Sequence, residues 1–168
     1  MGDVQLHHYQ HVWPERFAAE KTKIRRCLGK DYPVEHIGST AVPGMKAKPV
    51  VDLMLGLPHL DIDRFLIDAL QKADYTYVPK DEWKERYFFR KGEPGNGTCH
   101  LHIVAYEGGE WRDKLAFRDY LKKHPGKAAD YQKLKSRLAV KYRKNRSRYT
   151  ASKEPFIQHI LHLAAKES

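Results

Sequence analysis

Residues 36–57 read His36-Ile-Gly-Ser-Thr-Ala-Val-Pro-Gly-Met-Lys-Ala-Lys-Pro-Val-Val-Asp-Leu-Met-Leu-Gly-Leu57. The pattern predicts a short strand that ends at Gly38, a Gly-Ser turn, and a second strand over residues 49–57. The second strand is apolar almost throughout, which is typical of a strand buried on both faces of a sheet. Asp52 interrupts this run, and a carboxylate is costly to bury unless it is paired or binds a cation. Asp52 is therefore the first candidate for a functional residue.

The composition is that of a folded globular protein. Of the 168 residues, 41% are hydrophobic and 11% are aromatic, which is enough to build a substantial core. We expect a single domain over residues 1–168, with the sheet in about residues 1–110 and helices in about 111–168. Cys27 and Cys99 fall in a helix and a strand, and both are expected to be reduced core thiols. No basic start is followed by an apolar region and no run approaches the ~18 apolar residues of a membrane span, so we expect a cytoplasmic protein without a membrane partner.

The net charge of +10 is concentrated in the last third of the chain. Residues 112–168 contain 16 of the 31 Lys and Arg residues but only 5 of the 21 Asp and Glu residues. One interpretation is that these charges lie on solvated helix faces. The other is that the basic C-terminal helices form a surface for a polyanion, which would be RNA, DNA or the phosphate chain of a nucleotide.

Hydrophobic periodicity predicts helices on either side of a group of strands. Residues 98–105 alternate cleanly, so that His100 and His102 share one face of a strand. The Gly-rich turn at residues 92–97 predicts that this strand forms a hairpin with the strand before it. The fold class is therefore α/β or α+β, with a helical C-terminal region. We expect strands at 4–6, 33–37, 49–57, 75–78, 86–90 and 98–106, and helices at 14–28, 61–73 (with Asp61 as N-cap), 111–124, 127–146 and 152–165.

Asp52 and two histidines are the predicted catalytic or metal-binding residues. Side chains alternate along a strand, so a carboxylate pair on the face of Asp52 would need Asp or Glu at the position of Met54. That pair is absent. His100 and His102 point the same way, a geometry suited to a shared cation or to acid–base chemistry. If the two strands are neighbours, these histidines and Asp52 form a three-ligand site, to which His36 is a further candidate member.

The turn Gly38-Ser39-Thr40 is a candidate phosphate site. Its backbone N–H groups and two hydroxyls suit an anion, especially if a helical turn begins at Ser39, although the spacing is not that of a P-loop. Lys48 and Arg90 are the side chains expected to neutralise the phosphate, and each is alternatively an ordinary solvated charge. No Ser-His-Asp order or Cys-His pairing stands out in the sequence as a nucleophilic triad, and no Cys-x-x-Cys is present.

Several strings together resemble the GrpB family over nearly the whole chain. The most specific string is the one from His36 to Asp52. The family is assigned to the nucleotidyltransferase superfamily, with the fold of DNA polymerase β-like enzymes. The other matching strings are Tyr9 with Trp13-Pro14 and Phe17, Arg86-Tyr-Phe-Phe-Arg-Lys-Gly92, His100-Leu-His102, Trp111 to Leu121 with His124-Pro125, Tyr131-x-x-Leu134-Lys135, and Tyr149-Thr150 with Lys153.

The resemblance implies a mixed β-sheet flanked by helices, with the Gly-Ser turn and a strand carboxylate at a cleft. In active nucleotidyltransferases that turn holds the triphosphate, and three carboxylates on two strands hold two Mg²⁺ ions. Gly38, Ser39 and Asp52 match the turn and the first carboxylate, whereas Met54 departs from the second. The adjacent strand offers histidines, which prefer a borderline transition metal, so the expected cofactor is a divalent metal, Mg²⁺, Mn²⁺ or Zn²⁺. Some chains that resemble this one are fused to dephospho-CoA kinase, which indicates a nucleotide context.

Three functions are consistent with the sequence. The first is nucleotidyl or related phosphoryl transfer, with Asp52, His100 and His102 in the centre and a nucleotide or other phosphorylated small molecule bound at the Gly-Ser turn. The second is a non-catalytic nucleotide- or RNA-binding module on the same fold. The third is a metal-dependent hydrolase in the same cleft. Convergence of the carboxylate and the two histidines beside Gly38 would favour the first and third over the second.

Overall fold

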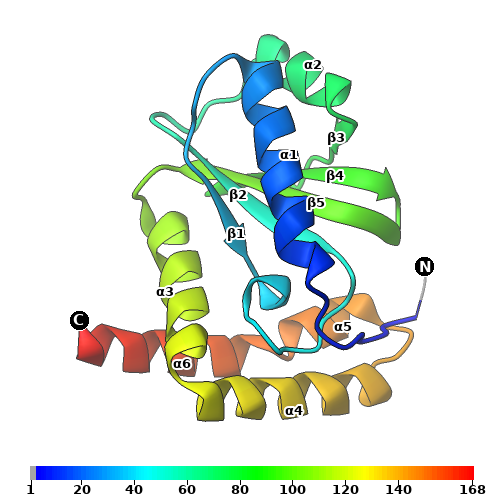
Figure 1. Ribbon diagram of the computed structural model, residues 1–168, viewed down its shortest axis with the longest axis vertical. Helices are drawn as coiled ribbons and strands as arrows, with labels where there is room; N and C mark the ends of the chain where they lie inside the picture. The colour runs from blue at the N-terminus through cyan, green and yellow to red at the C-terminus, as the bar shows by residue number, and fades with distance from the viewer. Residues whose placement is uncertain (1–2) are drawn as a thin grey trace.

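The computed structural model, which describes residues 3–168, contains one mixed sheet with the strand order β1-β2-β5-β4-β3 (Figure 1). β2 and β5 run parallel, and the other neighbouring strands run antiparallel. The apolar strand predicted from the sequence is β2, and all of its residues except Asp52 are buried. The predicted fold class and the predicted hairpin of the last two strands are confirmed. The strands are β1 (Val34–Ile37), β2 (Val51–Leu57), β3 (Tyr75–Tyr77), β4 (Arg86–Glu93) and β5 (Asn96–Ala105).

Helices α1 (Val12–Leu28) and α2 (Arg64–Lys72) cover one face of the sheet (Figure 1). Their apolar sides meet the inward side chains of β2 and β5, including Leu53 and Leu101, in the largest cluster of buried residues. This face therefore supplies most of the hydrophobic stabilisation of the sheet. It leaves the opposite side of β2 and β5, where Asp52 lies, to be covered by other elements.

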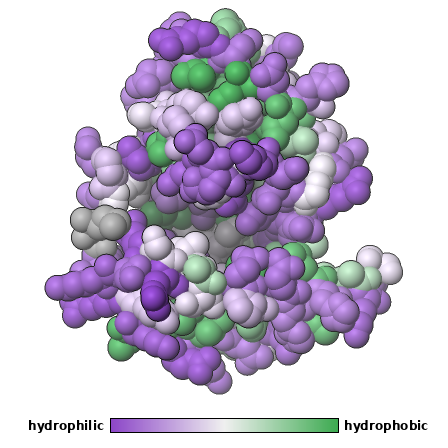
Figure 2. Space-filling model, turned by 180° about the vertical axis from the view of Figure 1, so that it is seen from behind, coloured by the Kyte–Doolittle hydropathy of each residue, from purple (hydrophilic) through white to green (hydrophobic). Residues whose placement is uncertain are grey.

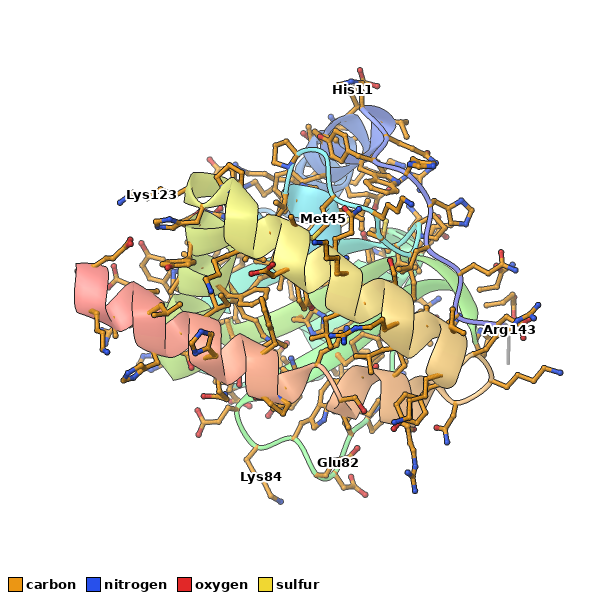
Figure 3. All side chains as sticks on the ribbon, turned by 90° about the horizontal axis from the view of Figure 1, so that it is seen from below. His11, Met45, Glu82, Lys84, Lys123 and Arg143 are labelled. Atoms are coloured by element: carbon orange, nitrogen blue, oxygen red, sulfur yellow. The ribbon has the colours of Figure 1, made fainter. Side chains whose placement is uncertain are left out.

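Four helices lie on and below that opposite side. They are α3 (Gly109–Lys123), α4 (Pro125–Lys141), α5 (Arg146–Ala151) and α6 (Glu154–Glu167). Trp111 of α3 packs with Met54 of β2 and Val104 of β5. α4 and α6 pass beneath the sheet, and Met45, in the loop between β1 and β2, packs against residues of α3, α4 and α6 (Figure 3). The loop before β2 is thereby fixed between the sheet and the C-terminal helices.

Three predicted elements were wrong in detail. Val4 to Leu6 do not form a strand; the Val4 N–H donates to the Arg143 carbonyl, and His7 forms an isolated bridge with Ala47. The predicted helix over 127–146 ends at Lys141, because the chain leaves the helix at Tyr142 and α5 starts separately. The side chain of Asn145 accepts a hydrogen bond from the Arg148 N–H and caps this extra helix.

The start of α2 also differs from the prediction. Asp63, not Asp61, is the N-cap, because its carboxylate accepts a hydrogen bond from the Leu66 N–H. Cys27 and Cys99 are both free thiols, as predicted. Among the described residues, no helix combines the length and the apolarity that crossing a membrane requires.

Candidate functional site

The backbone of Gly38 lies directly against the carboxylate of Asp52. β1 and β2 pair so that Ile37 is opposite Asp52, and the chain turns immediately after this pair. Gly38 has a φ of 75°, a conformation that favours glycine. A Cβ atom at this position would lie 2.6 Å from Asp52 Oδ2. Glycine is therefore required both for the turn and for the close approach of the turn to the carboxylate.

Asp52 lies between the two predicted histidines. The parallel register places Asp52 opposite His100 and Met54 opposite His102. Asp52 Oδ1 is 3.6 Å from His100 Nδ1 and 3.5 Å from His102 Nε2, and the Asp52 side chain is 30% exposed. Burial opposes ionisation of this carboxyl, but the two imidazoles hold its pKa well below the usual range. Asp52 is thus an ionised carboxylate with one side open to a ligand.

His102 is the more enclosed of the two histidines. Burial lowers the pKa of His102, although the neighbouring Asp52 acts in the opposite direction. Its Nδ1 atom is buried without a hydrogen-bond partner in the described part of the chain. Phe88 of β4 packs its ring against both His100 and His102, with ring centroids 5.0 and 5.4 Å apart. The imidazoles are therefore held in place by an aromatic neighbour rather than by further polar groups.

The three side chains predicted as metal ligands lie close together. Donor separations of about 3.4 Å are expected around a tetrahedral metal with 2.1 Å bonds, close to the two distances from Asp52 to His100 and His102. Across residues 3–168, however, no three His, Cys, Asp or Glu side chains are grouped in an arrangement that is ready to hold an ion. Binding of Mg²⁺, Mn²⁺ or Zn²⁺ by these residues stays a prediction.

His36 and Thr40 are engaged with each other. His36 Nε2 is 2.8 Å from Thr40 Oγ1, and its ring stacks on Phe17 with centroids 4.9 Å apart. Burial lowers the pKa of His36 to about 4, so the imidazole is neutral near pH 7. Thr40 is buried. These two predicted site residues therefore stabilise the turn. Ser39, which lies beside the Tyr131 side chain, is only partly buried.

The two predicted phosphate-neutralising side chains have different surroundings. Arg90 pairs with His100 across β4 and β5 and so shares its face, but its Nε donates to the Gly92 carbonyl. Lys48 is half-buried, and its Nζ lies 5.5 Å from the centroid of the Tyr149 ring. Its pKa is lowered by burial, with Asp52 acting in the opposite direction. Lys48 is therefore the stronger candidate of the two for contact with an anion near Asp52.

Two lysines that the sequence prediction missed join Lys48. Lys135 of α4 is 2% exposed, lies 5.1 Å from the Tyr131 ring centroid and donates from Nζ to the Lys46 carbonyl. Lys153, just before α6, lies 4.9 Å from the ring centroid of Tyr149. The sequence carried one usable signal, since Tyr131 and Lys135 are four residues apart on the buried stripe of a helix. We refer to Lys48, Lys135 and Lys153 as the lysine cluster.

The ammonium groups of the lysine cluster lower one another's pKa. Burial, together with the nearby charges of Lys153 and Lys48, lowers the pKa of Lys135 to about 7. Burial likewise lowers the pKa of Lys153 to about 8, helped by Lys48 and Lys114 and opposed by Asp52. Positive charge is thus gathered near Asp52 at a cost in free energy that a bound anion would relieve.

Comparison with known proteins gives the family. A family profile described as GrpB protein matches residues 3–163. The chain belongs to the GrpB family. The GrpB crystal structure from Enterococcus faecalis superposes with a TM-score of 0.86 at 32% identity, covering 97% of this chain and 98% of that one. The fold described above is consistent with the superfamily placement of GrpB proteins.

Individual GrpB relatives differ in how much of their length this chain spans. A "glutamate-rich protein GrpB" of Alkalihalophilus pseudofirmus is 32% identical, with 95% of both chains covered. A UPF0157 protein of Pseudomonas aeruginosa is 37% identical over 89% of this chain but only 63% of its own length. A dephospho-CoA kinase of Mycobacterium leprae is 30% identical over 78% of this chain and 38% of its own length. The GrpB unit therefore also forms part of longer proteins.

The basic last third of this GrpB-family chain divides into an inner and an outer set. Arg118 donates to Glu35 and to the His36 carbonyl, and Arg146 donates to the Gly95 carbonyl. With Lys135 and Lys153, these residues turn toward the sheet. The exposed basic residues of α4 and the turn after it are Lys133, Arg137, Lys141, Arg143 and Lys144. The charge excess seen in the sequence therefore serves the candidate site as well as the outer surface.

Proposed function

We propose that this chain binds the phosphate chain of a nucleotide at the Gly38-Ser39 turn and transfers a phosphoryl or nucleotidyl group, with Asp52 as the catalytic carboxylate. The observation that carries the proposal is the contact between Gly38 and Asp52. It places exposed backbone of a turn, an ionised carboxylate and two imidazoles at one point, and lysines lie nearby. This combination suits an anionic substrate and a cation that bridges it to the carboxylate.

The roles follow from the surroundings of each group. Asp52, with His100 or His102, would hold a divalent cation, which would offset the repulsion between the carboxylate and a phosphate. Met54 is fully buried against Trp111, so its position belongs to the core and supplies no second carboxylate. Catalysis on this chain would therefore depend on one carboxylate, the flanking imidazoles and the basic side chains, which gives it a different ligand set from a three-carboxylate site.

Calorimetric titration with ATP and the other nucleoside triphosphates tests the proposal, in the presence and absence of Mg²⁺, Mn²⁺ or Zn²⁺. Asp52→Asn should weaken cation-dependent binding by roughly tenfold or more, because the cation loses its anionic ligand. Asp61→Asn is the matched control, since Asp61 is exposed and lies outside the site. Cation-dependent binding that is equal in the wild type and Asp52→Asn would contradict the proposal.

RNA binding by the outer basic residues is the second candidate. Lys141 and Lys144 are exposed near the end of α4, and no ion pair involves them in the described residues. A double change to Glu at both positions should weaken RNA retention in a gel-shift assay and reduce its salt dependence. The control is the double change Lys72→Glu and Lys84→Glu, which lies elsewhere on the surface. Retention that survives the first change, or that is lost equally with the control, contradicts this candidate.

A further inference from the structure

We propose that the lysine cluster is a second anion subsite, which binds the terminal phosphates of a ligand that carries at least two phosphate groups. That the natural ligand is a nucleotide rests on the function proposed above, whereas the expected affinity for inorganic polyphosphate does not. Lys48 comes from the loop before β2, Lys135 from α4 and Lys153 from the start of α6. Three distant segments of the chain thus deliver like charges to one location.

The arrangement of the ammonium groups is fixed by two tyrosines. Lys48 Nζ and Lys153 Nζ lie 5.5 and 4.9 Å from the ring centroid of Tyr149, and Lys135 Nζ lies 5.1 Å from that of Tyr131. Each distance is within the range of a cation–π contact, which stabilises a cation over the face of the ring. Both rings are buried. The lysines are therefore held in position before any ligand arrives.

The cluster lacks the negative charge that buried cations normally require. Among residues 3–168, none of its three lysines forms an ion pair with a carboxylate. Its neighbours add to the imbalance: Arg146 lies near Lys48, and Lys114 lies near Lys153. Asp52 and Glu154 are the nearby carboxylates, and the first of these is already flanked by two histidines. Buried charge without a partner is costly, so a multiply charged anion is the ligand that fits.

The location of the cluster sets the minimum length of that anion. Tyr131 lies beside Ser39 of the Gly-Ser turn, and Lys135 is one helical turn further along α4. Lys48 and Lys153 interact with Asp52 as well as with each other. A ligand with one phosphate at the turn would therefore extend toward the lysines, which points to a diphosphate or triphosphate chain and away from a simple phosphomonoester.

Binding of a polyphosphate to the lysine cluster should be accompanied by proton uptake, whereas binding to fully charged surface lysines should not. Lys135 and Lys153 have a pKa of about 7 and about 8 in the unliganded site. The groups that face them are Lys48, Lys114 and Asp52, with Tyr131, Tyr149 and the Lys46 carbonyl. A bound polyphosphate raises both pKa values, so protons are taken up near pH 8.

The experiment is calorimetric titration of the full chain with inorganic tripolyphosphate and with orthophosphate, without divalent cations, near pH 8. We expect tripolyphosphate to bind more tightly by a factor of ten or more, with a heat that changes with the ionisation enthalpy of the buffer. Lys153→Met and Lys48→Met should each weaken tripolyphosphate binding about tenfold, whereas Lys133→Met, an exposed lysine of α4, should not. Because Lys48 and Lys153 are only half-buried, both variants are expected to fold, which circular dichroism checks.

Two results would overturn this inference. The first is tripolyphosphate binding no tighter than orthophosphate binding, or equally strong in Lys153→Met and the wild type. The second is loss of cation-free tripolyphosphate binding in Asp52→Asn, because removal of a negative charge near the lysines should preserve or strengthen their binding of an anion. Failure of the nucleotide proposal is separate, since it would appear as unchanged cation-dependent ATP binding in Asp52→Asn while the tripolyphosphate result stands.

Discussion

Two charged clusters, each with a buried member, lie on different sides of the sheet, and their charged groups have different partners. On the face covered by α1, Glu20 is 5% exposed and its carboxylate accepts hydrogen bonds from Lys91 Nζ at 2.7 Å and from the Tyr75 hydroxyl at 2.8 Å. Burial opposes ionisation of Glu20, but these two partners hold its pKa below the usual value. On the other face, the ammonium groups of the lysine cluster contact aromatic rings and a backbone carbonyl, and across residues 3–168 none of them forms an ion pair with a carboxylate.

This difference between the two clusters indicates that one contributes to stability and that the other is suited to binding a ligand. A buried charge whose partners are all present contributes to one well-defined native state, whereas removal of one partner is strongly unfavourable. A cluster of like charges without partners lowers the stability of the unliganded fold, and such arrangements are concentrated at functional sites. The Glu20 cluster therefore has the features of a structural pair, and the lysine cluster beside Asp52 is the part of the chain for which we propose a ligand.

The largest expected effect comes from unbalancing the structural cluster. Glu20→Ala leaves Lys91, whose side chain is 18% exposed, without its carboxylate. We expect the free energy of unfolding to fall by about 3 kcal/mol, measured by urea denaturation. Glu15→Ala on the exposed side of α1 is the control and should change stability by less than about 0.5 kcal/mol. A loss for Glu20→Ala no greater than that of the control would show that the pair is not structural.

The second-largest expected effect comes from a substitution of Gly38, which lies against Asp52. Gly38→Ala should destabilise the fold by about 2 kcal/mol, because it adds backbone strain and a collision with Asp52. Gly44→Ala isolates the strain, since Gly44 has a φ of 81° and nothing within 4 Å of the added Cβ. Denaturation and nucleotide titration of both variants provide the measurement. Equal losses of stability and unchanged nucleotide binding in both would remove the special role of the Gly38–Asp52 contact.

The smallest expected effect is an increase in the free energy of unfolding. Lys135→Met removes an unpaired buried charge, so the unliganded protein should gain about 1 kcal/mol near pH 6.5. In the folded protein the pKa of Lys135 is lowered from 10.5 to about 7. Between these two pH values the unfolded wild type therefore binds more protons than the folded protein does. The free energy of unfolding of the wild type consequently rises with pH across this window. The advantage of the variant should therefore shrink by about pH 9.5, as urea denaturation at the two pH values would show. An advantage that does not change with pH, or none, contradicts the assignment; Lys133→Met is the control.

The sequence predicted the sheet and the acidic side of the site better than the basic side. Alternation along β5 and the apolar run of β2 are local patterns, and they sufficed to bring His100 and His102 to Asp52 once the strands paired. The lysine cluster depends on how α4 and α6 pack beneath the loop before β2, which no local pattern encodes. Lys135 therefore looked like any other lysine in a basic helix, although its place on the stripe of Tyr131 was visible in the sequence.

The boundaries of the C-terminal helices were missed for a related reason. Helical spacing continued past Lys141, and only the tertiary contacts around Tyr149 and Val4, which share a small buried cluster, required the chain to turn there. Figure 2 shows the molecule from behind, with a mostly hydrophilic surface over both the upper part and the layer of C-terminal helices. Composition left open whether the basic residues of that layer are solvated or bind a polyanion, and it did not indicate that Lys135 is buried.

The most direct test of the central claim is a crystal structure of this chain with a non-hydrolysable nucleoside triphosphate and Mn²⁺. The account predicts a metal ion bound to the carboxylate of Asp52, one phosphate at the Gly38-Ser39 turn, and the terminal phosphates in contact with Lys48 and Lys153. Phosphates bound only on the exposed face of α4, with no density beside Asp52 at a ligand concentration that saturates binding in solution, would contradict it.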